Sequence, residues 1–481
     1  MLKIFKNEAS LLILGRLLQL VYSFISIKLL TTLLSIEDVA NYYLILSLIG
    51  FFSMGLLSPS GSYHLTKFNS LHKSNKLFSS FVVLSLIILS LLLLASPIVY
   101  LYFNGLENKT LNFSFILAIM FIELIFGTIA GSVISAFNMF FYRIRFIVYT
   151  NIMLFLGLGM ALVLIFGLSN SVYFWLLGVT GAKLIVCCWV LFDFKRVFKC
   201  HIDWLYVRNC FLSKKTTCLA LKFCLPLSIS AFAVWSQSHY YRFYVNEYFD
   251  LQLVALVSIG FAIATNLTMA FESVINQYFM PTLYKDIDNE SLNKGEIYSS
   301  IFNAVIPLYL SFFIFLAYFS PLALKLLTNE RYSAAAEYML WGVAIESFRV
   351  SLRLFSNVLY LESKTKTIMF SSIIASALLL LLLFYTLDFV LIDITLLPFY
   401  ILIVTFISFM LVIYKVNKII VLKLDFAKFF TIIILSSVVW VFSFVEQSNI
   451  VFDVIELVVA GILFVSIQFY FNKSLFIKLP K

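Results

Sequence analysis

Long apolar stretches separated by short polar breaks run along the whole chain. Each is about 20 to 30 residues long, enough for an α-helix to cross the hydrocarbon core of a membrane. The stretches do not alternate apolar and polar residues at period two, as the strands of a membrane β-barrel do. Fourteen spans are predicted, at roughly 9–34, 39–62, 77–103, 111–138, 146–168, 172–194, 219–245, 251–281, 298–321, 335–361, 367–387, 393–414, 426–446 and 450–471. The pattern therefore predicts an all-α polytopic membrane protein.

The first stretch, Ala9 to Leu34, carries two full charges, Arg16 and Lys28, among its apolar residues. Polar side chains also recur along it at i, i+3, i+7 and i+10 and so share one helical face: Arg16, Gln19, Ser23 and Ser26. Charge inside a bilayer is costly. We therefore expect this polar stripe to face other helices or a water-filled cavity.

Composition excludes a soluble chain, because 62% of the residues are hydrophobic and only 12% are charged. Arg16 interrupts the first stretch and no small-residue cleavage site follows, so we expect a retained span and not a cleaved signal. The six cysteines lie between positions 187 and 224 and fit no standard zinc spacing. We predict unpaired structural thiols, no metal site and no cofactor.

Lysine and arginine mark the orientation of the spans. Alternate loops and the two termini carry 25 of these residues, whereas the opposite loops carry only Lys109, Lys325 and Arg331. Because loops rich in lysine and arginine stay in the cytoplasm, both termini are predicted to be cytoplasmic. The net charge of +10 is then an orientation signal and a contact with anionic lipid, not a nucleic-acid-binding surface.

The longest loop predicts the domain organisation. It follows the sixth span and holds an amphipathic segment, Ile202–Leu212, in which Trp204 is a candidate interfacial anchor. We predict a six-helix lobe at 1–195, a cytoplasmic inter-lobe loop at 196–222, a second six-helix lobe at 223–415, and two additional helices at 416–481. Six spans are an even number, so the two lobes would be parallel repeats.

Basic residues inside the predicted spans are candidates for substrate binding, since guanidinium and ammonium groups bind anions such as a pyrophosphate. They are Arg16, Lys28, Lys183, Arg242, Arg349 and Arg353, with His239 on the face of Arg242. Structural alternatives remain open. Lys28 and Arg242 lie near span ends and could reach the membrane surface. Glu346 and Arg349 could form an i, i+3 ion pair.

Acidic residues inside the spans are candidates for ion coupling. Glu123 and Glu272 have no basic neighbour at i±3 or i±4, so we expect burial to let them exchange protons, with Glu123 favoured. Gly127 and Gly131 follow Glu123 by one and two turns and predict close helix packing. Coupling to a proton or sodium gradient is therefore a hypothesis.

Several segments carry sequence motifs at turns and span ends. The turn Leu34–Tyr42, with Ile36 and Ala40 in place of a proline and a second glycine, is similar to the L-G-P-E-E-F-G-x-Y motif and so resembles the polysaccharide transporters of the MOP (MATE-like) superfamily. Gly55–Pro59 and Lys222–Pro226 resemble the end of their second span and the start of their seventh. Pro321–Ala336 is similar to P-x-x-x-x-L-f-G-x-x-Y-x-x-A-a, although its glycine is replaced by Thr328 or Asn329. The resemblance covers about residues 5–420.

The resemblance implies a Wzx-like flippase in the bacterial cytoplasmic (inner) membrane. Such a protein moves a polyprenyl-pyrophosphate-linked oligosaccharide, a repeat unit of O-antigen, capsule or exopolysaccharide, by alternating access. Its partners would be the lipid-linked substrate, membrane lipids, and the polymerase and chain-length machinery, with no nucleic acid. One alternative is a MATE-like multidrug exporter, although buried bases outnumber buried acids here. The other is a membrane glycosyltransferase or polymerase, which needs a long outer loop that this chain lacks.

The predicted topology can be tested at Cys210, in the inter-lobe loop. In a variant that retains only this cysteine, a membrane-impermeant thiol reagent is expected to label permeabilised cells and not intact ones. Labelling of intact cells would show that the loop faces outward.

Overall fold

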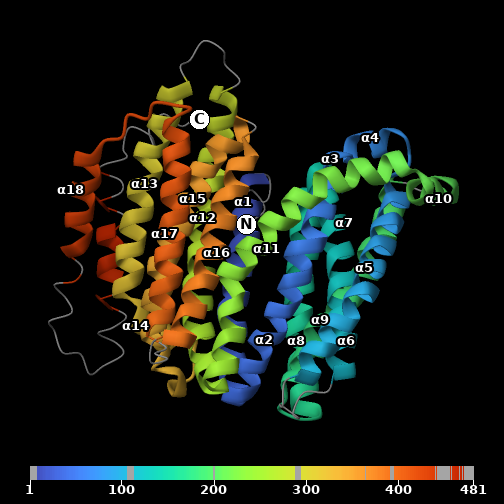
Figure 1. Ribbon diagram of the computed structural model, residues 1–481, viewed down its shortest axis with the longest axis horizontal. Coiled ribbons are helices and arrows are strands. Elements are labelled where there is room, and N and C mark those ends of the chain that lie inside the picture. The colour runs from blue at the N-terminus through green and yellow to red at the C-terminus, as the bar shows by residue number, and fades with distance from the viewer. Residues whose placement is uncertain are drawn as a thin grey trace. The chain divides into compact units, whose positions relative to one another are not determined.

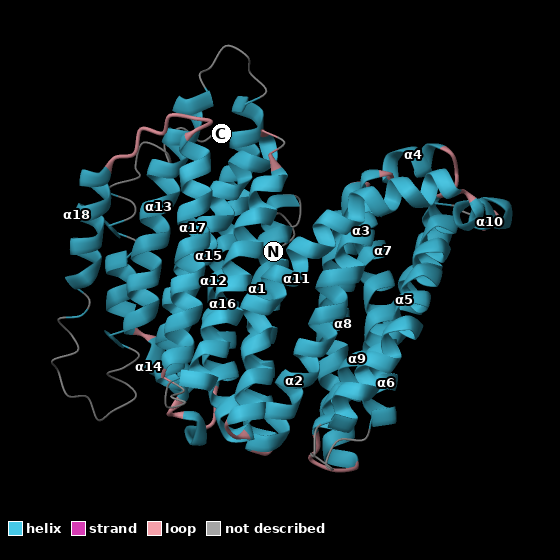
Figure 2. Ribbon diagram, in the orientation of Figure 1, coloured by secondary structure: helices cyan, strands magenta, loops and turns pink. Residues whose placement is uncertain are grey.

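The computed structural model is helical in almost all of the chain that it describes. The described residues are 8–105, 113–198, 201–287, 294–362, 364–389, 395–438, 440, 455–456, 458–464, 466–467 and 470. No strand occurs among them (Figure 2). Eleven of the described helical segments are long and apolar enough to cross a membrane. The predicted all-α polytopic fold is therefore confirmed.

Each of the first twelve predicted spans coincides with a helix or with consecutive helical segments. The tenth, α15 (Ala335–Leu361), has the length of a span but is not among the eleven apolar segments. Its charged residues Glu346, Arg349 and Arg353 lower its mean hydropathy. The thirteenth contains a shorter apolar helix, α18 (Phe426–Ser437). Much of the fourteenth lies outside the described residues, so the total of fourteen stays a prediction.

The chain divides into two compact units, Met1–Ala255 and Leu256–Lys481. The first holds α1 (Glu8–Leu33), α2 (Ile36–Phe52), η2 (Ser53–Leu57), α3 (Ser58–Thr66), α4 (Phe68–Lys73), α5 (Leu77–Gly105), α6 (Phe113–Ile122), η3 (Glu123–Gly127), α7 (Thr128–Met139), α8 (Arg143–Gly167), α9 (Val172–Phe198), α10 (Trp204–Leu212) and α11 (Lys214–Tyr248). Within it, α8 packs along α9, and α11 packs against α2, η2 and α3 (Figure 1).

The second unit contains most of α12 (Leu251–Ile287), then α13 (Lys294–Tyr318), α14 (Ser320–Leu327), η4 (Glu330–Tyr332), α15, α16 (Thr365–Phe389), α17 (Leu396–Asn417) and α18. Here α17 packs against α15 and α16, and α18 packs against α13 (Figure 1). The predicted lobes at 1–195 and 223–415 have other limits than these units, and those lobe boundaries stay a prediction.

The acidic turn between the first two spans is a helix cap. Ser35 is the N-cap of α2, and its hydroxyl accepts a hydrogen bond of 3.0 Å from the backbone N–H of Asp38. Glu37 and Asp38 occupy the first turn, where a negative charge is stabilised by the helix dipole. The turn that carries the family resemblance thus starts a helix.

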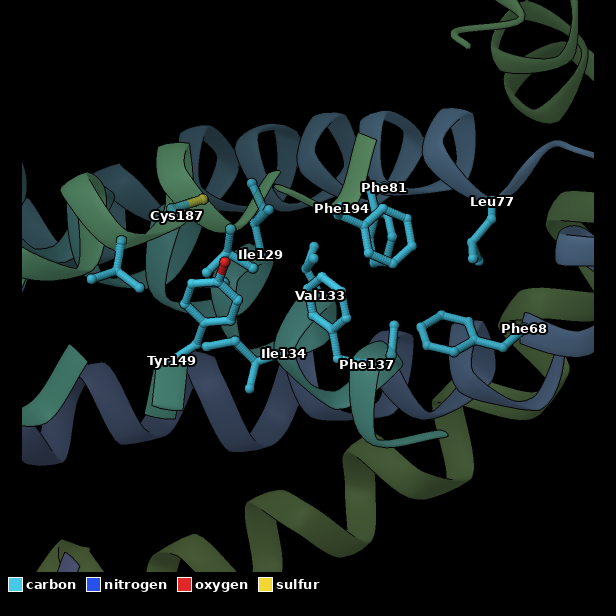
Figure 3. Packing of buried hydrophobic residues seen from close by; sticks show 14 of the residues in the cluster. Phe68, Leu77, Phe81, Ile129, Val133, Ile134, Phe137, Tyr149, Cys187 and Phe194 are labelled. Carbon is cyan, nitrogen blue, oxygen red and sulfur yellow. The ribbon is translucent and has the colours of Figure 1, made fainter. Parts of the chain in front are cut away.

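Phenylalanines from four helices fill the core of the first unit (Figure 3). The rings of Phe81 on α5 and Phe194 on α9 have centroids 5.5 Å apart, and Phe137 on α7 lies at the same distance from Phe194. Phe68 on α4 contacts Phe81 from the other side, at 5.9 Å. Edge-to-face contacts of this kind stabilise a core beyond the area that they bury. They tie α4, α5, α7 and α9 together.

The amphipathic segment in the long loop forms the helix α10. Asp203 caps it by accepting a hydrogen bond of 3.0 Å from the backbone N–H of Tyr206. One side packs on α5 and α11. Trp204 and Leu205 remain 66% and 69% exposed. The predicted amphipathic segment is therefore a helix, whereas the role of Trp204 as an interfacial anchor and the cytoplasmic position of the loop stay predictions.

The contact between α8 and α9 yields a stability prediction. A Cβ atom added at Gly178 of α9 would lie 2.3 Å from the backbone N and Cα of Ala161 on α8. Since neither backbone can give way locally, Gly178→Ala should lower the free energy of unfolding by about 1–3 kcal/mol. Thermal unfolding of the purified protein in detergent measures this effect. The control is Gly159→Ala, because a Cβ there meets nothing within 4 Å; equal losses for the two variants would contradict the packing argument.

Candidate functional site

The contact of α11 with α2 and η2 includes the ring of Phe232 on α11 and Gly55 in η2. A Cβ atom at Gly55, in the π-helical segment η2, would lie 2.0 Å from Cε1 of Phe232, so only glycine leaves room for this ring. Three residues after Phe232 on α11, the indole N–H of Trp235 donates a hydrogen bond of 2.9 Å to the backbone carbonyl of Ser47 on α2. The glycine in the family-like segment Gly55–Pro59 therefore serves helix packing.

Arg242 lies on the same face of α11 and is only 7% exposed. Its Nη1 donates to the Ser47 hydroxyl at 2.8 Å, and its guanidinium carbon lies 5.1 Å from the centroid of the Tyr43 ring. The same nitrogen lies 3.1 Å from Nδ1 of His239. A guanidinium only donates, so Nδ1 of His239 acts as the acceptor. The structure thus brings the predicted residues Arg242 and His239 together.

Tyr43 and Ser47 were not among the predicted site residues. They are four residues apart on α2 and so share one face, which is the available sequence signal. That signal is weak, because tyrosine and serine are common in this chain and only the fold shows which of them meets Arg242.

The polar stripe of α1 begins beside a packing face. A Cβ atom at Gly15 would lie 2.8 Å from the side chain of Ile147, and Tyr22 contacts the ring of Phe155, so this face packs on α8. Arg16 is one residue, or about 100°, further round the helix and is exposed. Its Nη1 donates a hydrogen bond of 2.8 Å to Oε1 of Gln19, which confirms that these two stripe residues share a face. Lys28 is exposed as well.

Glu123 forms an ion pair with Lys183. The glutamate starts the π-helical segment η3, and the lysine comes from the middle of α9. Both side chains are largely buried, at 17% and 22% exposure. The prediction that Glu123 lies unpaired is therefore wrong, because it considered only neighbours along one helix.

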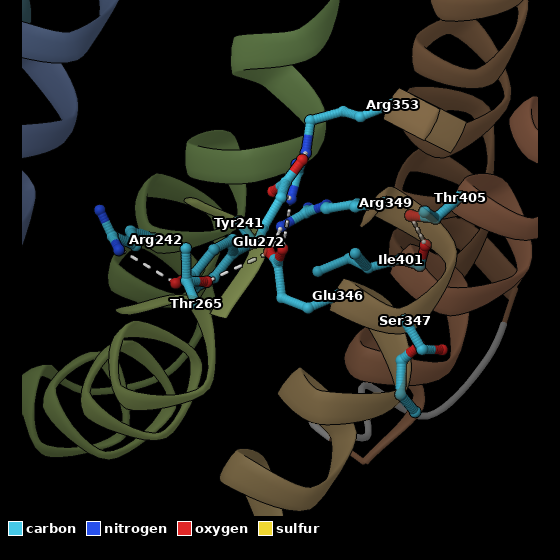
Figure 4. A network of polar contacts seen from close by, with 11 residues as sticks. Tyr241, Arg242, Thr265, Glu272, Glu346, Ser347, Arg349, Arg353, Ile401 and Thr405 are labelled. Atoms are coloured by element: carbon cyan, nitrogen blue, oxygen red, sulfur yellow. Dashed lines mark hydrogen bonds and ion pairs between the residues drawn. The ribbon is translucent and has the colours of Figure 1, made fainter. Parts of the chain in front are cut away.

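A network of two glutamates and two arginines joins α12 to α15 (Figure 4). Glu346 is 2% exposed, and its Oε1 lies 2.8 Å from Nη1 of Arg349. Nη2 of Arg353 lies 2.8 Å from Oε2 of Glu272 and 3.5 Å from Oε2 of Glu346. The hydroxyl of Thr265 donates to Oε1 of Glu346 at 3.1 Å. Paired guanidinium and carboxylate groups of this kind hold two helices in register.

This network tests two sequence-based expectations. Glu272 was expected to be unpaired, and that is wrong, since Nε of Arg353 donates to both of its carboxylate oxygens at 3.0 Å. The i, i+3 pair of Glu346 and Arg349 is confirmed. Three of the predicted substrate-binding cations, Lys183, Arg349 and Arg353, therefore each contact a glutamate.

The segment with the most detailed family resemblance also serves packing. Tyr332 and Ala335 are fully buried where α15 begins. A Cβ atom at Gly260 of α12 would lie 2.8 Å from the carbonyl oxygen of Ala335 and 2.6 Å from the backbone nitrogen of Met339. The motif residues therefore position the start of α15 against α12, and so support the ion-pair network further along both helices.

Comparison with known proteins identifies the fold. No protein-family model matches the sequence, and no curated protein sequence matches it. Among solved structures, the Lipid II flippase MurJ in an inward closed conformation matches with a TM-score of 0.70 at 14% identity, over 98% of this chain and 99% of that one. A MOP-superfamily transporter from Pyrococcus furiosus matches with a TM-score of 0.53 at 11% identity, over 86% and 95%. The MATE multidrug transporter DinF-BH matches with 0.55 at 14%, over 89% and 96%. The predicted resemblance to the MOP superfamily is confirmed for the fold.

The α12–α15 network predicts a large effect of removing Glu346. Without this carboxylate, Arg349 loses its ion pair and Arg353 keeps only its pair with Glu272, so Glu346→Ala should cost about 3–5 kcal/mol of stability. Thermal unfolding in detergent provides the measurement, and Glu337→Ala, an exposed change in the first turn of the same helix, is the matched control. If both variants unfold at the wild-type temperature, the network does not stabilise the fold.

Proposed function

We propose that this protein is a flippase that carries a polyprenyl-pyrophosphate-linked oligosaccharide from the inner to the outer leaflet of a bacterial cytoplasmic membrane. The head group would cross through a polar path while the lipid tail stays in the bilayer. Alternating access, in which the two halves of a transporter open in turn toward each side, would drive the movement. Both termini would be cytoplasmic.

The single observation that carries this proposal is the extent of the fold shared with the Lipid II flippase, which includes nearly all of both chains. The matches to the MATE multidrug transporters leave a larger part of this chain uncovered. A flippase for a lipid-linked precursor must handle a long lipid tail and an anionic pyrophosphate together. This chain offers arginine and lysine on helices that are otherwise apolar, the residue types that bind phosphate oxygens.

The first contact with the pyrophosphate is assigned to Arg16 and Lys28 on α1, with Arg242 on α11 as a further contact. Arg16 and Lys28 are exposed, so an anion can approach them directly. Arg242 is held by the Ser47 hydroxyl and the Tyr43 ring, which fix the direction of its guanidinium. Such preorganisation lowers the entropy lost on binding. Lys183, Arg349 and Arg353 would act mainly within their ion pairs.

In this proposal, the glutamates that couple transport to an ion gradient are members of ion pairs. Glu123 and Glu272 would contribute through their ion pairs with Lys183 and Arg353. An ion gradient would then drive transport through the breaking of an ion pair. Consumption of the glycan by a polymerase on the outer side is the other driving force, and it places the polymerase and chain-length machinery among the partners.

The test is flipping of a labelled lipid-linked glycan by the purified protein in proteoliposomes. Arg16→Ala should reduce the initial rate at least about tenfold, which corresponds to about 1.4 kcal/mol. The unfolding temperature should not change, because Arg16 is exposed. Arg16→Lys should retain part of the rate, since it keeps the charge and loses the planar fork that binds two phosphate oxygens.

Arg208→Ala, at an exposed arginine of α10, is the control for a general loss of positive charge. If wild-type protein moves cationic dyes across the membrane and not the labelled glycan lipid, the multidrug-exporter hypothesis replaces the flippase. If the protein extends or cleaves the glycan, it is a glycosyltransferase or polymerase.

A further inference from the structure

A pocket inside the first unit is bordered by the Glu123–Lys183 ion pair and has no substrate contact assigned to it above. Its volume is about 380 Å³, within the range of about 300–1,000 Å³ that is usual for small-ligand pockets. Two π-helical segments border it, η2 through Ser53 and Leu57 and η3 through Glu123 and Gly127. Single π-helical turns inside α-helices occur frequently at functional sites.

Hydroxyl groups line this pocket from two sides. Ser53, Ser58 and Ser62 come from η2 and α3, and Thr128, Ser132 and Ser135 come from α7. None of these six hydroxyls forms a hydrogen bond with a described residue. Many helical hydroxyls in the chain bond to their own helix, as Ser47 does to the carbonyl of Tyr43 and Thr180 to that of Leu176. The six pocket hydroxyls do not, and their residues are half-buried or, for Ser58, exposed, so their donors and acceptors remain open to a polar ligand that enters the pocket.

The charges at this pocket cancel. Lys183 contacts Oε1 of Glu123, so together they add no net charge that would select an anion or a cation. The second carboxylate oxygen, Oε2, is buried and accepts no hydrogen bond from a described residue. It is therefore an acceptor for a donor that a ligand brings.

We propose that this pocket binds a neutral, hydroxyl-rich group, namely a sugar residue of the lipid-linked oligosaccharide. The inference rests on the proposed function and assigns a second part of the substrate to a separate place in the first unit. A sugar hydroxyl both donates and accepts, which matches six hydroxyls and the free lone pairs of Glu123. A pyrophosphate only accepts and is charged, so it fits this lining less well than it fits the exposed cations of α1.

Two glycines allow the pocket to be filled without disturbing its walls. A Cβ atom at Gly61 or at Gly131 would meet nothing within 4 Å, although both residues line the pocket. The prediction that Gly131 mediates close helix packing is therefore wrong. A leucine at either position would project into open space. Leucine also has a high helix propensity, so the substitution should not destabilise the helix. Gly159 on α8 also has nothing within 4 Å and is not among the lining residues, so Gly159→Leu is the matched control.

The experiment compares two probes on the full-length protein in lipid nanodiscs. One is undecaprenyl pyrophosphate, and the other is the same lipid carrying one neutral hexose. Binding is measured by native mass spectrometry and by tryptophan fluorescence. We expect Gly61→Leu and Gly131→Leu to raise the Kd for the hexose-bearing lipid at least about tenfold, or about 1.4 kcal/mol. The Kd for the sugar-free lipid should stay within about twofold of the wild-type value, and Gly159→Leu should change neither.

Each other outcome overturns the proposal in a recognisable way. If the two probes lose affinity equally, the pocket supports the fold or the pyrophosphate site and not a sugar. If neither loses affinity, no sugar enters the pocket. If the filled variants keep their affinity for the hexose-bearing lipid and lose a response of binding to sodium or pH, the pocket holds a cation. If wild-type protein binds neither probe, the proposed function fails, and not the assignment of this pocket alone.

Discussion

An ionised side chain in an apolar helix is tolerated only where an opposite charge or a polar group can reach it, and this constraint shapes both units of the chain. Glu123 reaches Lys183 across two helices of the first unit, and Arg353 reaches Glu272 across two helices of the second. Breaking such a pair leaves one charge without compensation, which costs more than the pair itself contributes. The pairs therefore act as constraints on which helices lie together, beyond any contribution to net stability.

Each of the two π-helical segments lies at a contact between helices. In η2, Gly55 makes room for the ring of Phe232, and in η3, Glu123 reaches Lys183 at the start of the irregular turn. An inserted residue in a helix rotates the side chains that follow it. Ser58 and Ser62 after η2, and Thr128 and Ser132 after η3, consequently line the same pocket. One packing contact and one ion pair thus give the pocket its hydroxyl lining.

Features that depend on neighbours along the chain could be predicted from the sequence. Hydropathy located the first twelve spans, and the spacing of Glu346 and Arg349 indicated their pair. Partners far apart in sequence could not be predicted, because spacing rules apply only within one helix. Glu123 therefore looked unpaired, although Lys183 lies 60 residues further along the chain. Gly131 likewise looked like a packing residue until its open surroundings were known.

The arginines differ in how readily each could exchange its present partner for a phosphate, because their partners differ. A phosphate that approaches Arg349 or Arg353 must compete with a buried carboxylate in a surrounding of low dielectric constant, where ion pairs are strong. A phosphate that approaches Arg16 replaces a hydrogen bond to the neutral amide of Gln19 on an exposed side chain. A hydrogen bond between a charged and a neutral group contributes about 1.5–3 kcal/mol, which is below the loss of about 3–5 kcal/mol when a buried ion pair is broken. A transporter must release its substrate as well as bind it. The stripe of α1 satisfies that requirement better than the ion-paired network, which is suited to keep α12 and α15 together while substrate passes.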